Sequence, residues 1–171
     1  MKEIVHDNSN EIIEKLLLLL KSLEIEYKMY KHKEVYTTAD IDKLEIKFEG
    51  MYCKNLFLRN SKGDVNYLLI IEDSKKADLK QLAKDIGSTR LSFASNERLY
   101  EYLALRPGSV TPFGLINDLH SEVIVMLDSD LVDLEKINFH PNINTATITV
   151  SYEGLNKFLK YQGNKVKLVK I

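Results

Sequence analysis

A strand–turn–strand pattern between residues 54 and 71 sets the strongest limit on how this chain folds. Polar and apolar residues alternate from Lys54 to Arg59, turn-forming residues occupy Asn60 to Gly63, and Tyr67 to Ile71 is an apolar, strand-forming run. Helical patterns precede and follow this hairpin. Because a hairpin joins antiparallel neighbours, we expect a mixed α/β (α+β) fold with a central mixed, largely antiparallel sheet flanked by helices, and not a doubly wound parallel sheet.

Apolar periodicity predicts helices on both sides of the hairpin. Leucine and isoleucine recur at helical spacing from Ile12 to Leu23, and we expect Asn8 and Glu11 to cap that helix. Further helices are expected at 38–44, 78–86, 95–103 and 152–161, with Gly87 and Gly163 as left-handed stops. The remaining strands are expected at 27–31, 92–94, 123–127, 145–150 and, at an edge of the sheet, 166–169.

Length and composition describe a globular chain with a sizeable core. The 171 residues are expected to form a single domain (1–171) with a frayed segment at 1–10. The longest aliphatic run, Leu16 to Leu20, is far shorter than the roughly 20 residues of a membrane span, and no leader pattern is present. We therefore expect a cytoplasmic protein without a membrane partner, as a monomer or weak dimer.

Charge and metal-ligating residues exclude several classes of function. A net charge of -1 gives no general basic surface, so any nucleic-acid contact must be local; the lysines at 28–33 and 165–170 are candidates, although lysines among glutamates usually form a solvated surface. The four histidines show no paired spacing and the one cysteine has no partner, so we expect no metal site. The one cysteine, Cys53, is interpreted as a small core residue, with a Cys53–histidine dyad as the alternative.

A small set of polar residues at predicted strand ends and loops remains for chemistry. His140 stands between Phe139 and Pro141, and the proline favours an extended histidine at a strand end, available for a pocket or for a core edge. Lys54, where a strand is expected to enter the sheet, suits an anion but equally an exposed edge. Asn55 offers a donor and an acceptor to an ester carbonyl, or simply starts a strand.

Four blocks of the sequence carry a family resemblance. They are KNLFLR (54–59), LSFAS (91–95), PGSVTPFGLIND (107–118) and NFHP (138–141). In this order they resemble the YbaK/aminoacyl-tRNA synthetase-associated domain family, and within it the free-standing homologues of the prolyl-tRNA synthetase editing domain (ProX, PrdX or ProXp-ala type). The resemblance runs from about Leu23 to the carboxyl end.

The resemblance implies trans-editing, the hydrolysis of alanine wrongly esterified to the proline tRNA. A pocket built for proline discriminates by only about 1–3 kcal/mol per missing methylene, so the synthetase admits alanine and a second, smaller site must clear the error. The implied pocket is tight and apolar. The implied partners are the acceptor end of the proline tRNA and, as a further option, prolyl-tRNA synthetase; no metal or cofactor is implied.

The resemblance also assigns residues to this site. It places Lys54 near the terminal phosphates or ribose, Asn55 on the ester and His140 beside the aminoacyl group, in a mechanism partly assisted by the terminal ribose hydroxyl. The residues expected to line the substrate site are His32, Thr37, Gly108, Ser109, Val110, Thr111, Pro112, Phe139 and Pro141.

Two departures from the family pattern leave the amino acid open. The segment from Lys33 to Asp40 keeps only a valine and a threonine of the usual residues, and Tyr52-Cys53 replaces a small or histidine-containing pair. Deacylation of cysteine or serine from tRNA is therefore an alternative. A third option is a module that binds tRNA without turnover.

Overall fold

The structure is a computed structural model and describes residues 8–171. Its helices are α1 (Ser9–Ser22), α2 (Thr38–Asp42), α3 (Leu79–Asp85), α4 (Asn96–Leu103) and α5 (Tyr152–Gln162), with 3-10 turns η1 (Pro112–Asn117) and η2 (Ser129–Leu131). Its strands are β1 (Lys28–Lys31), β2 (Met51–Asn60), β3 (Asn66–Glu72), β4 (Leu91–Phe93), β5 (Ile124–Asp128), β6 (Ile137–Phe139), β7 (Ala146–Val150) and β8 (Val166–Val169). Within these residues no helix is both long and apolar enough to cross a membrane.

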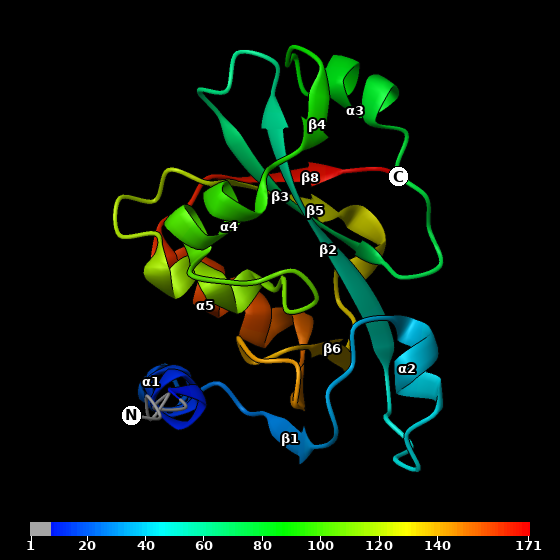
Figure 1. Ribbon diagram of the computed structural model, residues 1–171, viewed down its shortest axis with the longest axis vertical. Helices are drawn as coiled ribbons and strands as arrows, with labels where there is room; N and C mark the ends of the chain where they lie inside the picture. Colours follow the sequence, from blue (N-terminus) through cyan, green and yellow to red (C-terminus); the bar gives the residue numbers. More distant parts are fainter. Residues whose placement is uncertain (1–7) are drawn as a thin grey trace, which may run out of the picture.

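One mixed sheet organises the molecule (Figure 1). Its strand order is β1-β7-β6-β2-β3-β5-β8, and β4 pairs with β2. The pairs β1–β7, β6–β7, β2–β3 and β2–β4 are antiparallel, whereas β2–β6, β3–β5 and β5–β8 are parallel. The predicted mixed sheet is thus confirmed, with β8 at an edge as expected.

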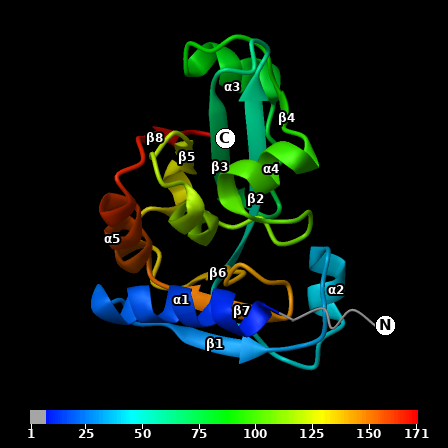
Figure 2. The ribbon, with the colours of Figure 1, turned by 60° about the vertical axis from the view of Figure 1, so that its left-hand side comes forward.

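The long strand β2 connects the two halves of the sheet, as Figure 2 shows. One of its edges pairs with β3 from Cys53 to Arg59. The other edge pairs with β6 only at Met51–Tyr52 and with β4 only at Leu58–Asn60, so the described residues leave a gap in the sheet between those two contacts. In an antiparallel pair, alternate residues of a strand form backbone hydrogen bonds to the same neighbour. The Asp73 amide donates to the Tyr52 carbonyl and the Asn60 amide to the Val65 carbonyl, so the backbones of even-numbered β2 residues face β3. The backbone of Asn55 therefore faces the gap.

Alternation along the strands separates two apolar faces. The larger core lies between the sheet and α1, α4 and α5, and includes Phe57, Ile70 and Phe158. The smaller core lies on the other face under α3, and includes Leu58 and Ile71. Because successive strand residues point to opposite faces, Asn55 shares a face with Phe57 and Lys54 points to the face of Leu58.

Local sequence signals set most element ends correctly. Thr37 begins α2 with a capping box to Asp40, and Ser95 accepts from the Arg98 amide at the start of α4. Gly87 and Gly163 have φ of +68° and +76° after α3 and α5, as predicted.

Other predictions of element ends were wrong. Asn8 precedes α1 but its side chain makes no capping hydrogen bond, and the helix already begins at Ser9 within the segment expected to fray; residues 1–7 lie outside the described chain. Strand β2 begins at Met51, since β6 pairs with its first two residues, so Lys54 lies inside the strand and not at its entrance. Two short elements were not predicted from the sequence: the strand at Ile137–Phe139 and the 3-10 turn that Pro112 opens.

Candidate active site

His32 and His140 lie close together on either side of strand β7. His32 follows β1, His140 follows β6, and β7 lies between these strands in the sheet. The backbone amide of His32 donates to the Thr145 carbonyl at 2.9 Å, which holds the end of β1 against β7. The two imidazole rings are 6.5 Å apart, centre to centre. Two sequence-predicted site residues are therefore brought together.

The hydrogen bonds of each histidine define its tautomer. His140 Nδ1 lies 3.0 Å from the Ala146 carbonyl oxygen, and a carbonyl only accepts, so Nδ1 carries a proton. His32 Nδ1 likewise donates to the Lys33 carbonyl at 2.7 Å, and its Nε2 accepts from the Thr147 hydroxyl at 2.9 Å. Within residues 8–171 no group bonds to His140 Nε2, which leaves one imidazole lone pair for a ligand.

Burial keeps His140 neutral. Desolvation lowers the pKa of His140 below its ordinary value of 6.5; the hydrogen bond to Ala146 opposes this shift, and the nearby His32 adds to it. A neutral imidazole with Nδ1 protonated presents Nε2 as a hydrogen-bond acceptor at neutral pH.

An aromatic cluster supports the histidine pair and was not predicted. The Phe48 ring makes edge contacts with Tyr30, His32 and Tyr52, at centroid distances of 5.0, 6.0 and 5.8 Å. Thr147 completes the support by bonding His32. No sequence signal marks these contacts, because Thr147 lies 115 residues from its partner and Phe48 lies outside any strand.

Asn55 connects the gap in the sheet to the loop at residues 108–112, the glycine loop. Its Nδ2 donates to the Val110 carbonyl at 3.1 Å, while its buried Oδ1 has no partner among residues 8–171. The amide nitrogen has two N–H groups, so Asn55 can still donate to an ester carbonyl as the sequence suggested. Its Oδ1 can in addition accept from a donor such as an ammonium group.

The glycine loop is fixed by its own hydrogen bonds. Gly108 has φ of +88°, and an added Cβ would lie 2.9 Å from Cδ1 of Tyr36. The Ser109 amide and hydroxyl both donate to the Arg106 carbonyl, at 3.1 and 2.9 Å. Thr111 Oγ1 caps η1, in which Pro112 takes the first position. Ser109 therefore does not offer a bare amide to a ligand.

The other predicted site residues lie in different surroundings. Lys54 is half-buried. Tyr52 pairs with Asn138, and side chains two residues apart in a strand share a face, so Lys54 lies on the same face of the sheet as Asn138, two residues before His140. Thr37 is occupied in capping α2. Phe139 is 3% exposed and packs on Phe113, so it supports β6 from the core.

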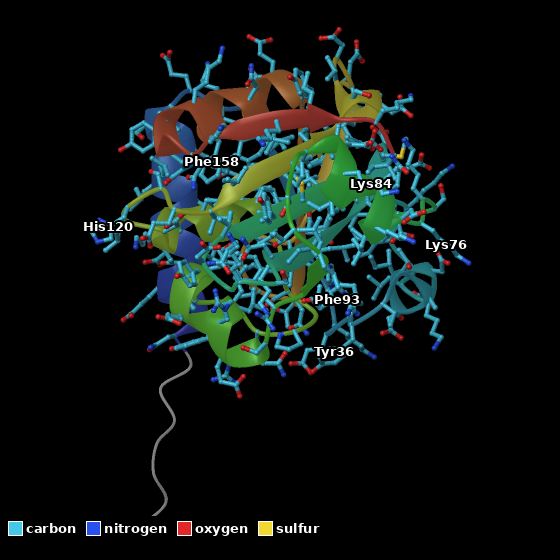
Figure 3. All side chains as sticks on the ribbon, turned by 90° about the horizontal axis from the view of Figure 1, so that it is seen from above. Tyr36, Lys76, Lys84, Phe93, His120 and Phe158 are labelled. Atoms are coloured by element: carbon cyan, nitrogen blue, oxygen red, sulfur yellow. The ribbon has the colours of Figure 1, made fainter. Side chains whose placement is uncertain are left out.

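Cys53 and the metal-ligating residues offer no alternative chemistry here. Burial, reinforced by acidic residues, raises the pKa of Cys53 to about 12, so its thiol stays protonated at neutral pH. The core interpretation of Cys53 agrees with its packing against the larger core. Among residues 8–171 no three histidine, cysteine or acidic side chains gather as metal ligands would. His120 projects from the surface far from Tyr36 in Figure 3.

Comparison with known proteins identifies the kind of site. Residues 32–158 match the aminoacyl-tRNA editing domain. The chain belongs to the aminoacyl-tRNA editing domain family. It is 44% identical over 152 residues to the prolyl-tRNA editing protein ProX of Acetoanaerobium sticklandii, covering 89% of this chain and 93% of that protein. It is 32% identical over 149 residues to the prolyl-tRNA synthetase associated domain-containing protein 1 of Bos taurus, covering 85% and 86%.

Solved structures show the same fold. One, described as a candidate trans-editing enzyme for prolyl tRNA synthetase, aligns with a TM-score of 0.66 over 95% of this chain and 97% of that one, at 20% sequence identity. The family predicted from the four sequence blocks is confirmed, and with it the class of enzyme, an aminoacyl-tRNA deacylase.

Proposed function

We propose that this protein is a trans-editing deacylase that hydrolyses alanine from mischarged proline tRNA. The observation that carries the proposal is the neutral His140, whose Nε2 is unbonded within the described chain and whose Nδ1 is fixed by Ala146. The family and the ProX relative support tRNA editing as the setting. We further propose cytoplasmic action, with the acceptor end of the proline tRNA as partner.

In the proposed reaction, water attacks the ester carbonyl carbon. Nε2 of His140 accepts the proton of that water, and the neighbouring ribose hydroxyl positions it. The bond between the carbonyl carbon and the ribose oxygen then breaks. The leaving oxygen takes the proton back from Nε2, which yields free alanine and an uncharged tRNA. General base catalysis of this kind contributes about 10²–10⁴ in rate.

Asn55 and Lys54 have different proposed roles in substrate binding. The unpartnered Oδ1 of Asn55 accepts from the α-ammonium of alanine, because a buried acceptor without a donor costs about 1–3 kcal/mol and a substrate ammonium would satisfy it. The Lys54 ammonium holds a terminal phosphate or the ribose.

The glycine loop is the proposed sieve. The loop is held by the hydrogen bond from Asn55 to the Val110 carbonyl and by the close packing of Gly108 against Tyr36. In this position it would clash with a substrate amino acid whose side chain is larger than that of alanine. Alanine passes, and the ring of proline does not.

The test is a panel of alanyl-, cysteinyl-, seryl- and prolyl-tRNA of the proline type, each followed for loss of the ester. The proposal expects rapid loss of alanine and retention of proline. Faster loss of cysteine or serine would assign the protein to another small amino acid. No loss from any of the four would leave a tRNA-binding module. His140→Gln, which keeps a polar side chain of similar size, is the matched inactive variant.

A further inference from the structure

A groove of about 770 Å³ opens beside the histidine pair and contains neither Lys54, Asn55 nor His140. Its walls are the start of α1, the end of α4, the loop after α4 and residues 142–146. It joins the proposed site through Ser109 of the glycine loop and through Ala146, whose carbonyl accepts from His140. A space of this size lies in the range of about 300–1,000 Å³ that suits a drug-sized ligand, and exceeds what an alanyl group needs.

Aromatic rings and cations line the groove. Tyr36 and Tyr100 are each 60% exposed, and Figure 3 shows Tyr36 at the edge of the molecule. The Tyr36 hydroxyl donates to Glu34 at 3.1 Å, which restrains the ring. Lys31 and Arg106 are exposed lining residues and form no ion pair among the described residues. Exposed tyrosines with nearby cations suit stacked bases and phosphates.

A buried amide side chain, that of Asn142, is among the residues that line the groove. Asn142 lines it and is 8% exposed, with φ of +66°. Its Nδ2 donates to the Phe113 carbonyl at 3.3 Å, and its Oδ1 has no hydrogen-bond partner in the part of the chain that the structure describes. Buried polar atoms in proteins are nearly always bonded, so this acceptor points to a ligand with a donor, such as the exocyclic amine of cytosine or adenine.

We propose that this groove binds the unpaired nucleotides that precede the terminal adenosine of the aminoacylated RNA. The bases stack on Tyr36 and Tyr100, Arg106 and Lys31 contact phosphates, and Asn142 accepts from a base amine. The direction follows from the shared Ser109 and Ala146, which place the ester end of the strand at His140. The identity of the RNA rests on the proposed function. The binding of a single-stranded nucleic acid rests on the residues of the groove alone.

The experiment measures binding without the ester. The probe is the ribo-tetranucleotide ACCA with a 5′ fluorophore, followed by fluorescence anisotropy over a series of salt concentrations. The groove variants are Tyr100→Ala and Arg106→Gln. The matched controls are Tyr161→Ala and Arg90→Gln, which change an exposed tyrosine and an exposed arginine outside the groove.

We expect Tyr100→Ala to raise Kd at least about fivefold and Tyr100→Phe to restore binding, because a stacking ring is what the base needs. Arg106→Gln should raise Kd and reduce the salt slope by about 0.7, the value for one phosphate contact on a single strand. The controls should bind as the unchanged protein does. Equal Kd in groove and control variants, or no binding of ACCA by the unchanged protein, would overturn the proposal.

The two proposals fail in different ways. If the protein binds ACCA through Tyr100 and Arg106 but hydrolyses no aminoacyl-tRNA, the groove proposal stands and the deacylase proposal is refuted. If the protein hydrolyses alanyl-tRNA, and the groove variants have the same KM and the same affinity for ACCA as the unchanged protein, the deacylase proposal stands and the groove proposal is refuted.

Discussion

Gly108→Ala tests how the glycine loop is held. Gly108 has φ of +88°, where a residue with a Cβ costs about 1–2 kcal/mol. The new Cβ would also lie 2.9 Å from Cδ1 of Tyr36, so the ring must move, and overpacking of this kind costs about 1–3 kcal/mol. We expect a total loss of about 2–5 kcal/mol in the free energy of unfolding.

Gly87→Ala is the matched control. Gly87 also has a positive φ, +68°, but an added Cβ would meet nothing within 4 Å. This variant should lose only the backbone cost of about 1–2 kcal/mol.

The assay is thermal unfolding, combined with KM for alanyl-tRNA. At about 2–4 °C per kcal/mol for a chain of this size, Gly108→Ala should melt lower than Gly87→Ala by roughly 2–12 °C. Only Gly108→Ala should raise KM, because only it displaces Tyr36. Equal melting temperatures and equal KM in the two variants would refute the claim that Tyr36 closes against Gly108.

Three further predictions concern His140, the ion pairs and Cys53. Because the pKa of His140 is lowered from 6.5, its Nε2 stays unprotonated as pH falls through 6.5, so the acid limb of kcat/KM should lie below that value; a limb above 6.5 would contradict the assignment. The same shift should make the free energy of unfolding fall as pH drops below 6.5, and His140→Gln should remove both effects. Lys75→Met leaves the fully buried carboxylate of Asp128 without its partner at 2.6 Å and should destabilise by about 3 kcal/mol in urea unfolding, whereas Lys170→Met, at a 72% exposed lysine, should change stability by less than about 1 kcal/mol. With a thiol pKa of about 12, Cys53 should react slowly with thiol reagents at pH 7.5, and Cys53→Ala should deacylate normally; loss of activity would favour the Cys53–histidine dyad.

Local signals in the sequence specified much of the fold. Thr37 and Ser95 cap their helices because a hydroxyl reaches an amide three residues on, and Gly87 ends its helix because a left-handed φ disfavours other residues. These effects act within a few residues. The hairpin of β2 and β3 follows in the same way from a short turn.

Contacts between residues far apart in the chain determine the features that the sequence did not predict. Strand β2 starts at Met51 because β6, more than eighty residues later in the chain, pairs with it, and this places Lys54 inside the strand. The orientation of the Asn55 side chain depends on the Val110 carbonyl, 55 residues away, which accepts from one N–H of its amide and leaves Oδ1 without a partner among the described residues. Sequence patterns identify such residues but not the partner that selects their free group.

The most direct test of the account is the single-turnover rate of ester loss from alanyl- and prolyl-tRNA of the proline type, measured for the unchanged protein and for His140→Gln. The account predicts that alanine is released at least about 100-fold faster than proline, and that His140→Gln lowers the alanine rate by about 10²–10⁴. Equal rates for the two amino acids, or an alanine rate that His140→Gln leaves unchanged, would contradict it.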